Sequence, residues 1–342
     1  MEITYIVGNG LDIQYGLPTG YRDFYEYQAS IYTVEKEIGR VNYIYEALFA
    51  DSVNEYENWS DFELFVGQLT KDDDIFITDE VNREKFLEDF IDVIDDLRDY
   101  LKLVEEKFVF NDRLEIGFKA TLSNLMLDVP KKNVSQISTV LKNNWIEDDH
   151  VNILTLNYTS VFDKLFKQSE TSFYNMHKNN NYRTYIREPI HVHGLLSFGT
   201  ILGVNDHEQI SDRFSEAQRE DLIKSKIISS YRENWEVRNE GIIKQSKIIV
   251  LYGVSIGATD KYLWNQIAKH SLSNGVPIII YHYVKNFDAG NPLRVKRLYK
   301  AVEDKFINNC GMDSSKEKEL RENIITVVGK TIFNLVDEGV KE

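Results

Sequence analysis

The sequence has little of what stabilises secreted or metal-binding proteins. Among its 342 residues there are five prolines and a single cysteine, Cys310. One cysteine cannot form an intramolecular disulfide or a cysteine-based zinc site. No apolar run reaches the roughly 18 residues that a membrane-spanning helix needs, and the start Met1-Glu-Ile-Thr is not typical of a signal peptide. We therefore expect a cytoplasmic protein with no membrane partner.

Positive charge is also scarce. The chain has 40 lysines and arginines against 55 acidic residues, which gives a formal net charge of −15. A field of this sign repels nucleic acid, so we expect no general nucleic-acid binding. It does not favour an anionic cofactor either, and any phosphate must be held by local amides. Because apolar residues make up 42% of the chain, we expect a globular protein with one large core.

The N-terminal stretch, residues 3–18, predicts a ligand site. Residues 3–7 alternate and are β-branched or aromatic, which favours a short buried strand. The strand ends at Gly8-Asn9-Gly10, where two positions lack a Cβ and let the backbone approach a ligand closely. Asp12 is placed to cap a following helix, whose first amides favour a phosphate. These features predict a nucleotide site, although a tight turn alone would explain the same glycines.

From Tyr21 to about residue 147 the pattern is mainly helical. Ser60 to Glu63 fits a capping box, and Asp61 with Glu63 is alternatively a carboxylate pair for acid–base or metal chemistry. We expect residues 25–147 to form a helical insertion, and residues 1–24 and 148–342 to form an α/β core. A long amphipathic helix is predicted by apolar residues at steps of three or four, namely Phe86, Phe90, Ile94, Leu97, Leu101, Val104 and Phe108.

The second half of the chain is rich in predicted strands. They cover residues 151–156, 189–193, 247–252, 277–284 and 323–328. Strands that run into a turn and a helix favour parallel pairing, so we expect an open, mainly parallel α/β sheet of Rossmann type with a large helical insertion. Helices are expected over about 110–147 with loops, over about 215–245 and over 292–309.

Glycines and polar residues follow four predicted strands, at Gly8-Asn9-Gly10, Asn157-Tyr158-Thr159, His193-Gly194 and Ser255-Ile256-Gly257. Ligands of parallel sheets bind beyond the carboxyl ends of the strands, so we expect these motifs to converge at one edge. There, Asn157 can bind a ribose hydroxyl or orient a water, and His193 can act as a general base. An Asx turn at Asn157 and a structural histidine at position 193 would explain the same residues without chemistry.

His191 and His193 are two residues apart, which places both on one face of a strand. Such a pair can hold a metal, but no third ligand is evident, and we expect no metal site. A metal-dependent nuclease that uses Asp61, Glu63 and His191 with Mg²⁺ remains an alternative.

The N-terminal motif resembles the opening of the bacteriophage abortive infection AbiH family. The resemblance rests on Gly8-Asn-Gly-Leu-Asp12, Gly16-Leu-Pro-Thr19 and Tyr21-Arg-Asp-Phe24, and Trp59 to Glu63 is similar to a further segment of the family. It covers most of the chain and implies a role in defence against phage.

Four short motifs are similar to those of sirtuin-like NAD-binding folds. They are Gly8-x-Gly10 with Gly16-Leu-Pro18, Leu154 to Tyr158, His193-Gly194, and Tyr252 to Asp260. This resemblance implies that Asn157 contacts the nicotinamide-side ribose and that His193 is the catalytic base. Asp12 and Thr159 depart from the sirtuin motifs, and one cysteine cannot build the sirtuin zinc module, so protein deacylation is not implied.

The resemblances together imply an NAD glycohydrolase-like hydrolase that cleaves NAD to nicotinamide and ADP-ribose during abortive infection. A nucleotide sensor or phage-protein binder without turnover is the other alternative. The sequence leaves open the trigger, for which a phage-encoded partner is a candidate, and the oligomeric state, homo-oligomers included. The residues expected to bind the nucleotide are Gly8, Asn9, Gly10, Asp12, Pro18, Tyr158, Gly194, Gly253, Ser255 and Asp260.

Overall fold

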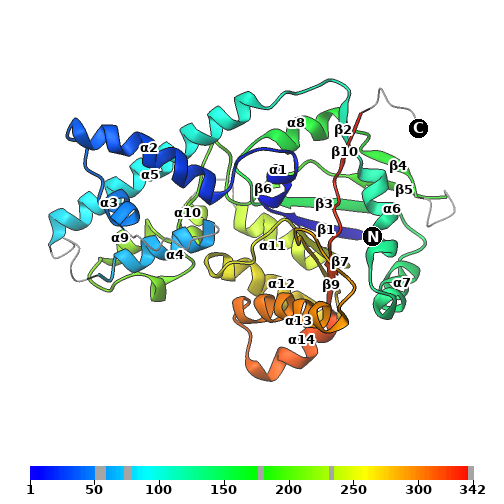
Figure 1. The fold of residues 1–342 in the computed structure, drawn as a ribbon. Helices are drawn as coiled ribbons and strands as arrows, with labels where there is room; N and C mark the ends of the chain where they lie inside the picture. Colours follow the sequence, from blue (N-terminus) through cyan, green and yellow to red (C-terminus); the bar gives the residue numbers. More distant parts are fainter. Residues whose placement is uncertain (51–58, 73–78, 176–180, 231–234, 338–342) are drawn as a thin grey trace.

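A central eight-stranded sheet organises the molecule (Figure 1). The computed structural model describes residues 1–50, 59–72, 79–175, 181–230 and 235–337. In spatial order the strands are β4 (Ser172–Tyr174), β5 (Arg183–Ile186), β3 (Asp149–Thr155), β1 (Glu2–Val7), β7 (Ile248–Tyr252), β8 (Ile278–His282) and β9 (Ile324–Val328), with β6 (Ile190–His191) also beside β3.

The sheet is parallel except for the edge pair β4–β5. Strands β5 and β6 pair with successive parts of β3, so they share one position in the sheet. Numbered along the chain, the parallel strands then lie in the order 3-2-1-4-5-6, which is the order of doubly wound dinucleotide-binding folds. The predicted open, mainly parallel α/β sheet is confirmed.

Alternation along β1 sends side chains to two hydrophobic layers. Tyr5 and Val7 face a layer that contains α6 (Phe118–Asp128), α7 (Val134–Asn143) and α8 (Val161–Gln168). Ile6 faces the opposite layer. That layer contains α11 (Trp235–Gln245), α12 (Lys261–Asn274), α13 (Pro292–Asn309) and α14 (Glu317–Asn323). Because both faces are covered, the central strands are buried except at some of their ends, as parallel strands usually are.

A large helical region lies beside one end of the sheet (Figure 1). It contains α2 (Tyr21–Glu37), α3 (Tyr43–Ala50), α4 (Trp59–Leu69) and α5 (Glu80–Lys107), with α9 (Glu216–Glu220) and α10 (Lys224–Ser230) from later in the chain. Helix α5 confirms the long helix that the apolar stripe over residues 86–108 predicts. The helical insertion is likewise confirmed.

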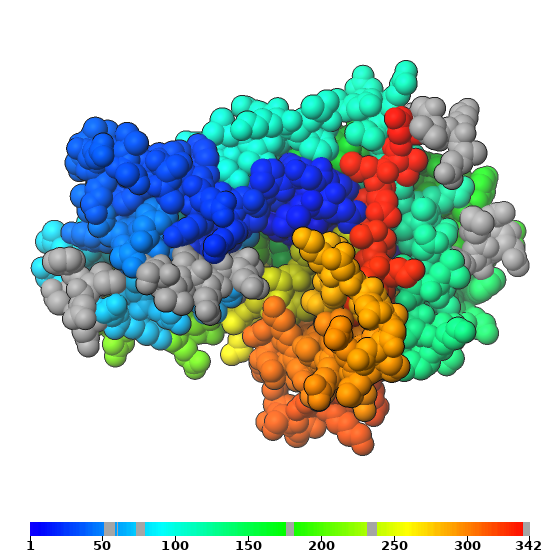
Figure 2. Space-filling model, viewed as in Figure 1, coloured from blue at the N-terminus to red at the C-terminus, as the bar shows by residue number. Residues whose placement is uncertain are grey.

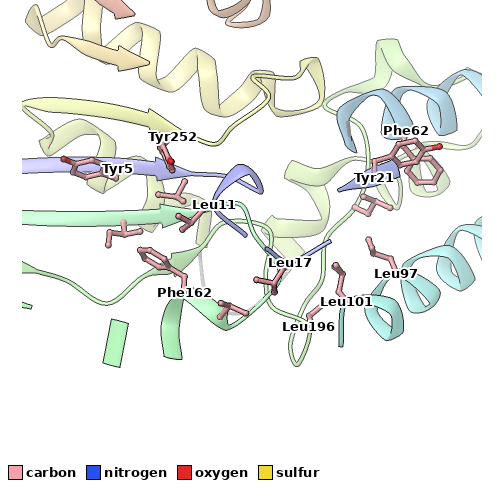
Figure 3. Close-up of a cluster of buried hydrophobic side chains, with 14 of the residues drawn as sticks. Tyr5, Leu11, Leu17, Tyr21, Phe62, Leu97, Leu101, Phe162, Leu196 and Tyr252 are labelled. Atoms are coloured by element: carbon pink, nitrogen blue, oxygen red, sulfur yellow. The ribbon is translucent and has the colours of Figure 1, made fainter. Parts of the chain in front are cut away.

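One hydrophobic cluster joins the insertion to the sheet. Figure 3 shows Leu17 between the sheet side, with Leu11 and Tyr252, and the insertion side, with Phe62 and Leu97. Because this core is continuous, the division into domains at residues 24 and 148 stays a prediction.

Short strands account for most of the differences from the sequence-based prediction. Residues 110–147 were expected as helix and loop, but β2 (Leu114–Ile116) pairs antiparallel with β10 (Leu335–Asp337). The C-terminal segment with β10 lies on the surface between the blue N-terminal residues and the teal residues of the α6 region (Figure 2). These strands, like β4 and β5, are three or four residues long and have too little sequence to show a period.

The single helix predicted over 215–245 is also wrong. Three separate helices, α9, α10 and α11, cover this range, and residues 231–234 lie outside the described part of the chain. Ser215 caps α9 by accepting a hydrogen bond from the Gln218 amide, a local start signal. No helix in the described ranges is long and apolar enough to cross a bilayer.

The hydrophobic core shared by the insertion and the sheet predicts that two leucines of α5 contribute differently to the free energy of unfolding. Leu97 of α5 is 0% exposed in the shared core, whereas Leu103 of the same helix is 42% exposed. We expect Leu97→Ala to lower the free energy of unfolding by about 2–5 kcal/mol, because it opens a cavity. Leu103→Ala should change it by about 0.5 kcal/mol or less. Urea denaturation followed by circular dichroism measures both, and equal losses would contradict the continuous core.

Candidate functional site

The loops that follow β1 and β7 are in direct contact. The Gly8 amide donates to the Tyr252 carbonyl at 2.9 Å, and the Gly10 amide donates to the Gly253 carbonyl at 2.8 Å. A Cβ on Gly10 would lie 2.6 Å from the Gly253 Cα, and Gly253 itself has a φ of +65°. The glycines therefore let two backbones touch. Both amides already donate to carbonyls in this structure. Their role in holding a pyrophosphate stays a prediction.

Asp12 does not cap a helix, so that prediction is wrong. Helix α1 (Gly10–Gln14) begins earlier, with Asn9 at its N-cap, and Asp12 lies inside its first turn. The Asp12 side chain is buried, and its Oδ2 accepts a hydrogen bond from the Thr159 hydroxyl at 2.6 Å. Burial raises the pKa of Asp12 to about 6, although Thr159 and Asn157 oppose the shift.

Asn157 is buried with no partner for its side-chain amide. Its backbone carbonyl lies 2.7 Å from His191 Nδ1. Neither Oδ1 nor Nδ2 of its side chain has a partner at hydrogen-bond geometry, although the amide is close enough to Asp12 to oppose the rise in that pKa. This excludes the Asx turn, in which Oδ1 would accept from the backbone. The Asp12 Oδ1 atom is buried and unpartnered as well. Each such atom costs about 1–3 kcal/mol unless water or a ligand binds it.

The two histidines contact different carboxylates. Strand β6 ends at His191, so the expectation that His191 and His193 share a strand face is wrong. His191 Nε2 lies 2.9 Å from Asp163 Oδ2, while His193 Nε2 lies 3.0 Å from Asp260 Oδ1. The latter pair is at ion-pair distance without hydrogen-bond alignment. In the described part of the chain, no group of three or more histidine, cysteine or acidic residues is arranged to hold a metal.

Asp260 belongs to a buried charge cluster, which we define as Glu63, Lys224, Asp260 and His193. Lys224 is 2% exposed, and its Nζ lies 2.7 Å from Glu63 Oε2 and 2.9 Å from Asp260 Oδ1. Glu63 also accepts from the Thr259 hydroxyl at 2.5 Å. The capping box predicted for Ser60 and Glu63 is wrong, because α4 already includes Trp59 and Ser60 lies inside it. No sequence pattern pointed to Lys224, which lies in a polar segment without a motif.

Opposing effects set the pKa values in this cluster. Burial would raise the pKa of Asp260, but Lys224 and His193 outweigh it and hold that pKa well below its ordinary value. Burial raises the pKa of Glu63 despite the nearby Lys224 ammonium. Burial would lower the pKa of Lys224, but Asp260 and Glu63 raise it, so the ammonium stays charged.

The remaining predicted residues have other contacts. Asn9 binds Thr19 through its side chain, and Pro18 is exposed while its carbonyl accepts from the Tyr100 hydroxyl at 2.6 Å. The Tyr158 hydroxyl donates to the Ile201 carbonyl at 2.7 Å.

Two further predicted residues lie in loops at this edge. Gly194 has a φ of +80°, and a Cβ there would lie 1.8 Å from the Gly199 carbonyl oxygen, so only glycine fits. Ser255, in the loop after β7, is exposed to solvent.

Direct contacts thus join the four strand-end motifs at one edge of the sheet. The β1 loop contacts the β7 loop, Asp12 contacts Thr159, Asn157 contacts His191, and His193 contacts Asp260. The sequence model for bacteriophage abortive infection AbiH matches residues 4–282 of the chain. The chain belongs to the AbiH family.

The matched range contains the residues of this edge described above, from Gly8 to Asp260. Membership of the AbiH family indicates a role in abortive infection, a defence against bacteriophage. Searches of curated proteins and of solved structures found no match to the chain.

The burial of Asp12 predicts that the free energy of unfolding of this AbiH protein falls as the pH rises. Because its pKa rises from 3.8 to about 6 on folding, the native state binds more protons between these values and loses stability as the pH rises through them. The full loss, about 3 kcal/mol, is present above pH 6. Asn at position 12 can still accept from Thr159 without ionising. We expect Asp12→Asn to stabilise the protein more at pH 7.5 than at pH 4, by urea denaturation, and an equal effect at both would contradict this.

The contact between the β1 and β7 loops predicts that two glycine-to-alanine substitutions have opposite effects on stability. Gly10→Ala should lower the free energy of unfolding by about 1–3 kcal/mol, because its Cβ would overlap the Gly253 backbone. Gly241 of α11 has no atom within 4 Å of an added Cβ, so Gly241→Ala should raise stability by about 0.5–1 kcal/mol. Thermal melting compares the two, and a tolerated Gly10→Ala would show that the loops can part.

Proposed function

We propose that this AbiH protein stops phage infection by hydrolysing NAD to nicotinamide and ADP-ribose at the carboxyl edge of its sheet. The observation that carries the proposal is the buried, unpartnered side-chain amide of Asn157, beside an unpartnered oxygen of Asp12. Loss of NAD would stop host metabolism before phage replication finishes.

The strand order supports a nucleotide as the substrate. A 3-2-1-4-5-6 sheet binds dinucleotides where the winding reverses, here between β1 and β7. The Asp12 and Asp260 side chains follow these two strands, and Asn157 and His193 follow the neighbouring β3 and β6. The similarity of these motifs to sirtuin-like folds supports NAD in particular.

The side chains of this edge suit cleavage of the N-glycosidic bond. Nicotinamide leaves with the bonding electron pair as a neutral molecule, and positive charge develops on the ribose. Water then adds to the ribose carbon, and His193 accepts its proton. The Asn157 amide orients the water and a ribose hydroxyl. Asp12, which is buried and ionised above pH 6, stabilises the developing positive charge.

Two contacts weigh against the nuclease alternative. Glu63 is bound to Lys224 and Thr259, and both ring nitrogens of His191 have partners. These residues are therefore committed to protein contacts. The assay below distinguishes an enzyme from a binding module without turnover.

We expect the purified protein to release nicotinamide and ADP-ribose from NAD, measured by liquid chromatography. Asn157→Ala and His193→Ala should each lower the rate by about a hundredfold or more, because each removes a group that acts in the transition state. His150→Ala is the matched control, since this half-exposed histidine lies at the opposite end of β3. Its rate should equal that of the wild type.

The same variants are then tested in cells challenged with phage while NAD is measured. Wild-type cells should lose NAD on infection and survive as a population, and the two site variants should do neither. Protection by the wild type with NAD unchanged would refute NAD hydrolysis. Binding of NAD without turnover would support the sensor instead.

A further inference from the structure

The buried charge cluster joins the helical insertion to His193. Glu63 comes from α4, Lys224 begins α10, Asp260 ends the 3₁₀ helix η4 (Ala258–Asp260), and His193 lies beyond β6. Helix α4 also packs directly against η4. Four segments that are far apart in the sequence therefore meet through charged groups that are all at least nine-tenths buried.

The geometry orders these groups in a chain. Lys224 Nζ lies between the two carboxylates, at 2.7 Å from Glu63 and 2.9 Å from Asp260, and Asp260 lies 3.0 Å from His193 Nε2. The same Asp260 oxygen, Oδ1, faces both Lys224 and His193. The position of Lys224 therefore fixes the position of the oxygen that His193 meets.

The charges of the four groups in the cluster must balance. One ammonium faces two carboxylates, so with both ionised the cluster is neutral only when His193 takes up a proton. Tyr158 also faces the cluster, with its ring centroid 6.4 Å from that of His193, but burial and the two carboxylates raise the pKa of its hydroxyl. Tyr158 thus stays neutral and adds no charge to the cluster.

We propose that Glu63 and Lys224 are positioning residues for His193, and that the helical insertion thereby completes the catalytic site. Lys224 holds the Asp260 carboxylate against Nε2 of the imidazole, and Glu63 holds Lys224. The negative charge of the carboxylate, 3.0 Å from Nε2, favours the proton on that nitrogen, which leaves Nδ1 to take the proton of the attacking water. This inference rests on the proposed function, in which His193 is the base.

The contribution of Glu63 follows from what its removal leaves. In Glu63→Gln, the ammonium of Lys224 has Asp260 as its remaining carboxylate partner and draws it away from His193. The cluster also loses one negative charge, which weakens the imidazolium form. Removal of the Asp260 carboxylate itself also leaves His193 without its carboxylate partner, in one step. If Glu63 acts through Asp260, the two changes are not additive.

The test is a double-mutant cycle of Glu63→Gln, Asp260→Asn and their combination. Nuclear magnetic resonance follows the titration of the His193 imidazole, and NAD hydrolysis gives kcat and KM over a range of pH. We expect Glu63→Gln to lower the His193 pKa and to lower kcat at least about tenfold with little change in KM. The double variant should have the kcat of Asp260→Asn to within about twofold.

Two further variants separate positioning from stability. Asp89→Asn removes another buried carboxylate of the insertion, one that binds Lys85 and the Tyr43 amide and does not contact His193. It should lower the melting temperature while leaving the His193 titration and kcat unchanged. Glu63→Asp keeps the charge and should recover part of the His193 pKa.

An unchanged His193 titration in Glu63→Gln, or losses in kcat that simply add in the double variant, would overturn the inference. The titration needs no NAD. A wild type that leaves NAD intact therefore refutes the proposed function, while the imidazole titration still decides whether Glu63 acts on His193.

Discussion

The close contact between the β1 and β7 loops is the constraint on which this edge of the sheet depends. At Gly10 and Gly253 the two backbones touch, and neither position has room for a side chain. Helix α1 begins at Gly10, directly at this contact, and carries the buried Asp12 that accepts from Thr159. It also occupies the Gly8 and Gly10 amides. The chemistry of the edge therefore falls to side chains rather than to a cradle of backbone amides.

Those side chains are held at a cost in stability. The Asn157 amide, one Asp12 oxygen and His193 Nε2 are buried without hydrogen bonds. Nearby, Ile256 has a φ of +52°, a strained value for a β-branched residue, and its carbonyl accepts from Asn309 at 2.9 Å. Unsatisfied polar atoms and backbone strain cluster where a structure serves function at the expense of stability. Other unpartnered buried atoms, such as the hydroxyls of Tyr5 and Thr326, lie elsewhere in the described core, whereas four belong to residues of this edge.

The sequence predicted the parts of the fold whose signal is local. The parallel strands and α5 show periodic apolar residues, and the places of Asn157 and His193 after strands of the sheet were predicted from local sequence. Pairing over long distances was not predictable, as β2 and β10 lie more than two hundred residues apart. For the same reason, the contacts of Lys224 could not be predicted from the sequence. Its role depends on Glu63 and Asp260, which meet it only after α4 packs on η4.

A crystal structure of the His193→Ala protein with NAD tests the central claim most directly. The account predicts the nicotinamide-side ribose within hydrogen-bond distance of the Asn157 amide, with the Asp12 carboxylate beside it. The molecule offers another place for a ligand, a cavity of about 230 Å³ at the opposite edge of the sheet, lined by residues that include Leu125, Trp145 and Phe173. NAD bound in that cavity, or absent from the carboxyl edge at saturating concentration, would contradict the account.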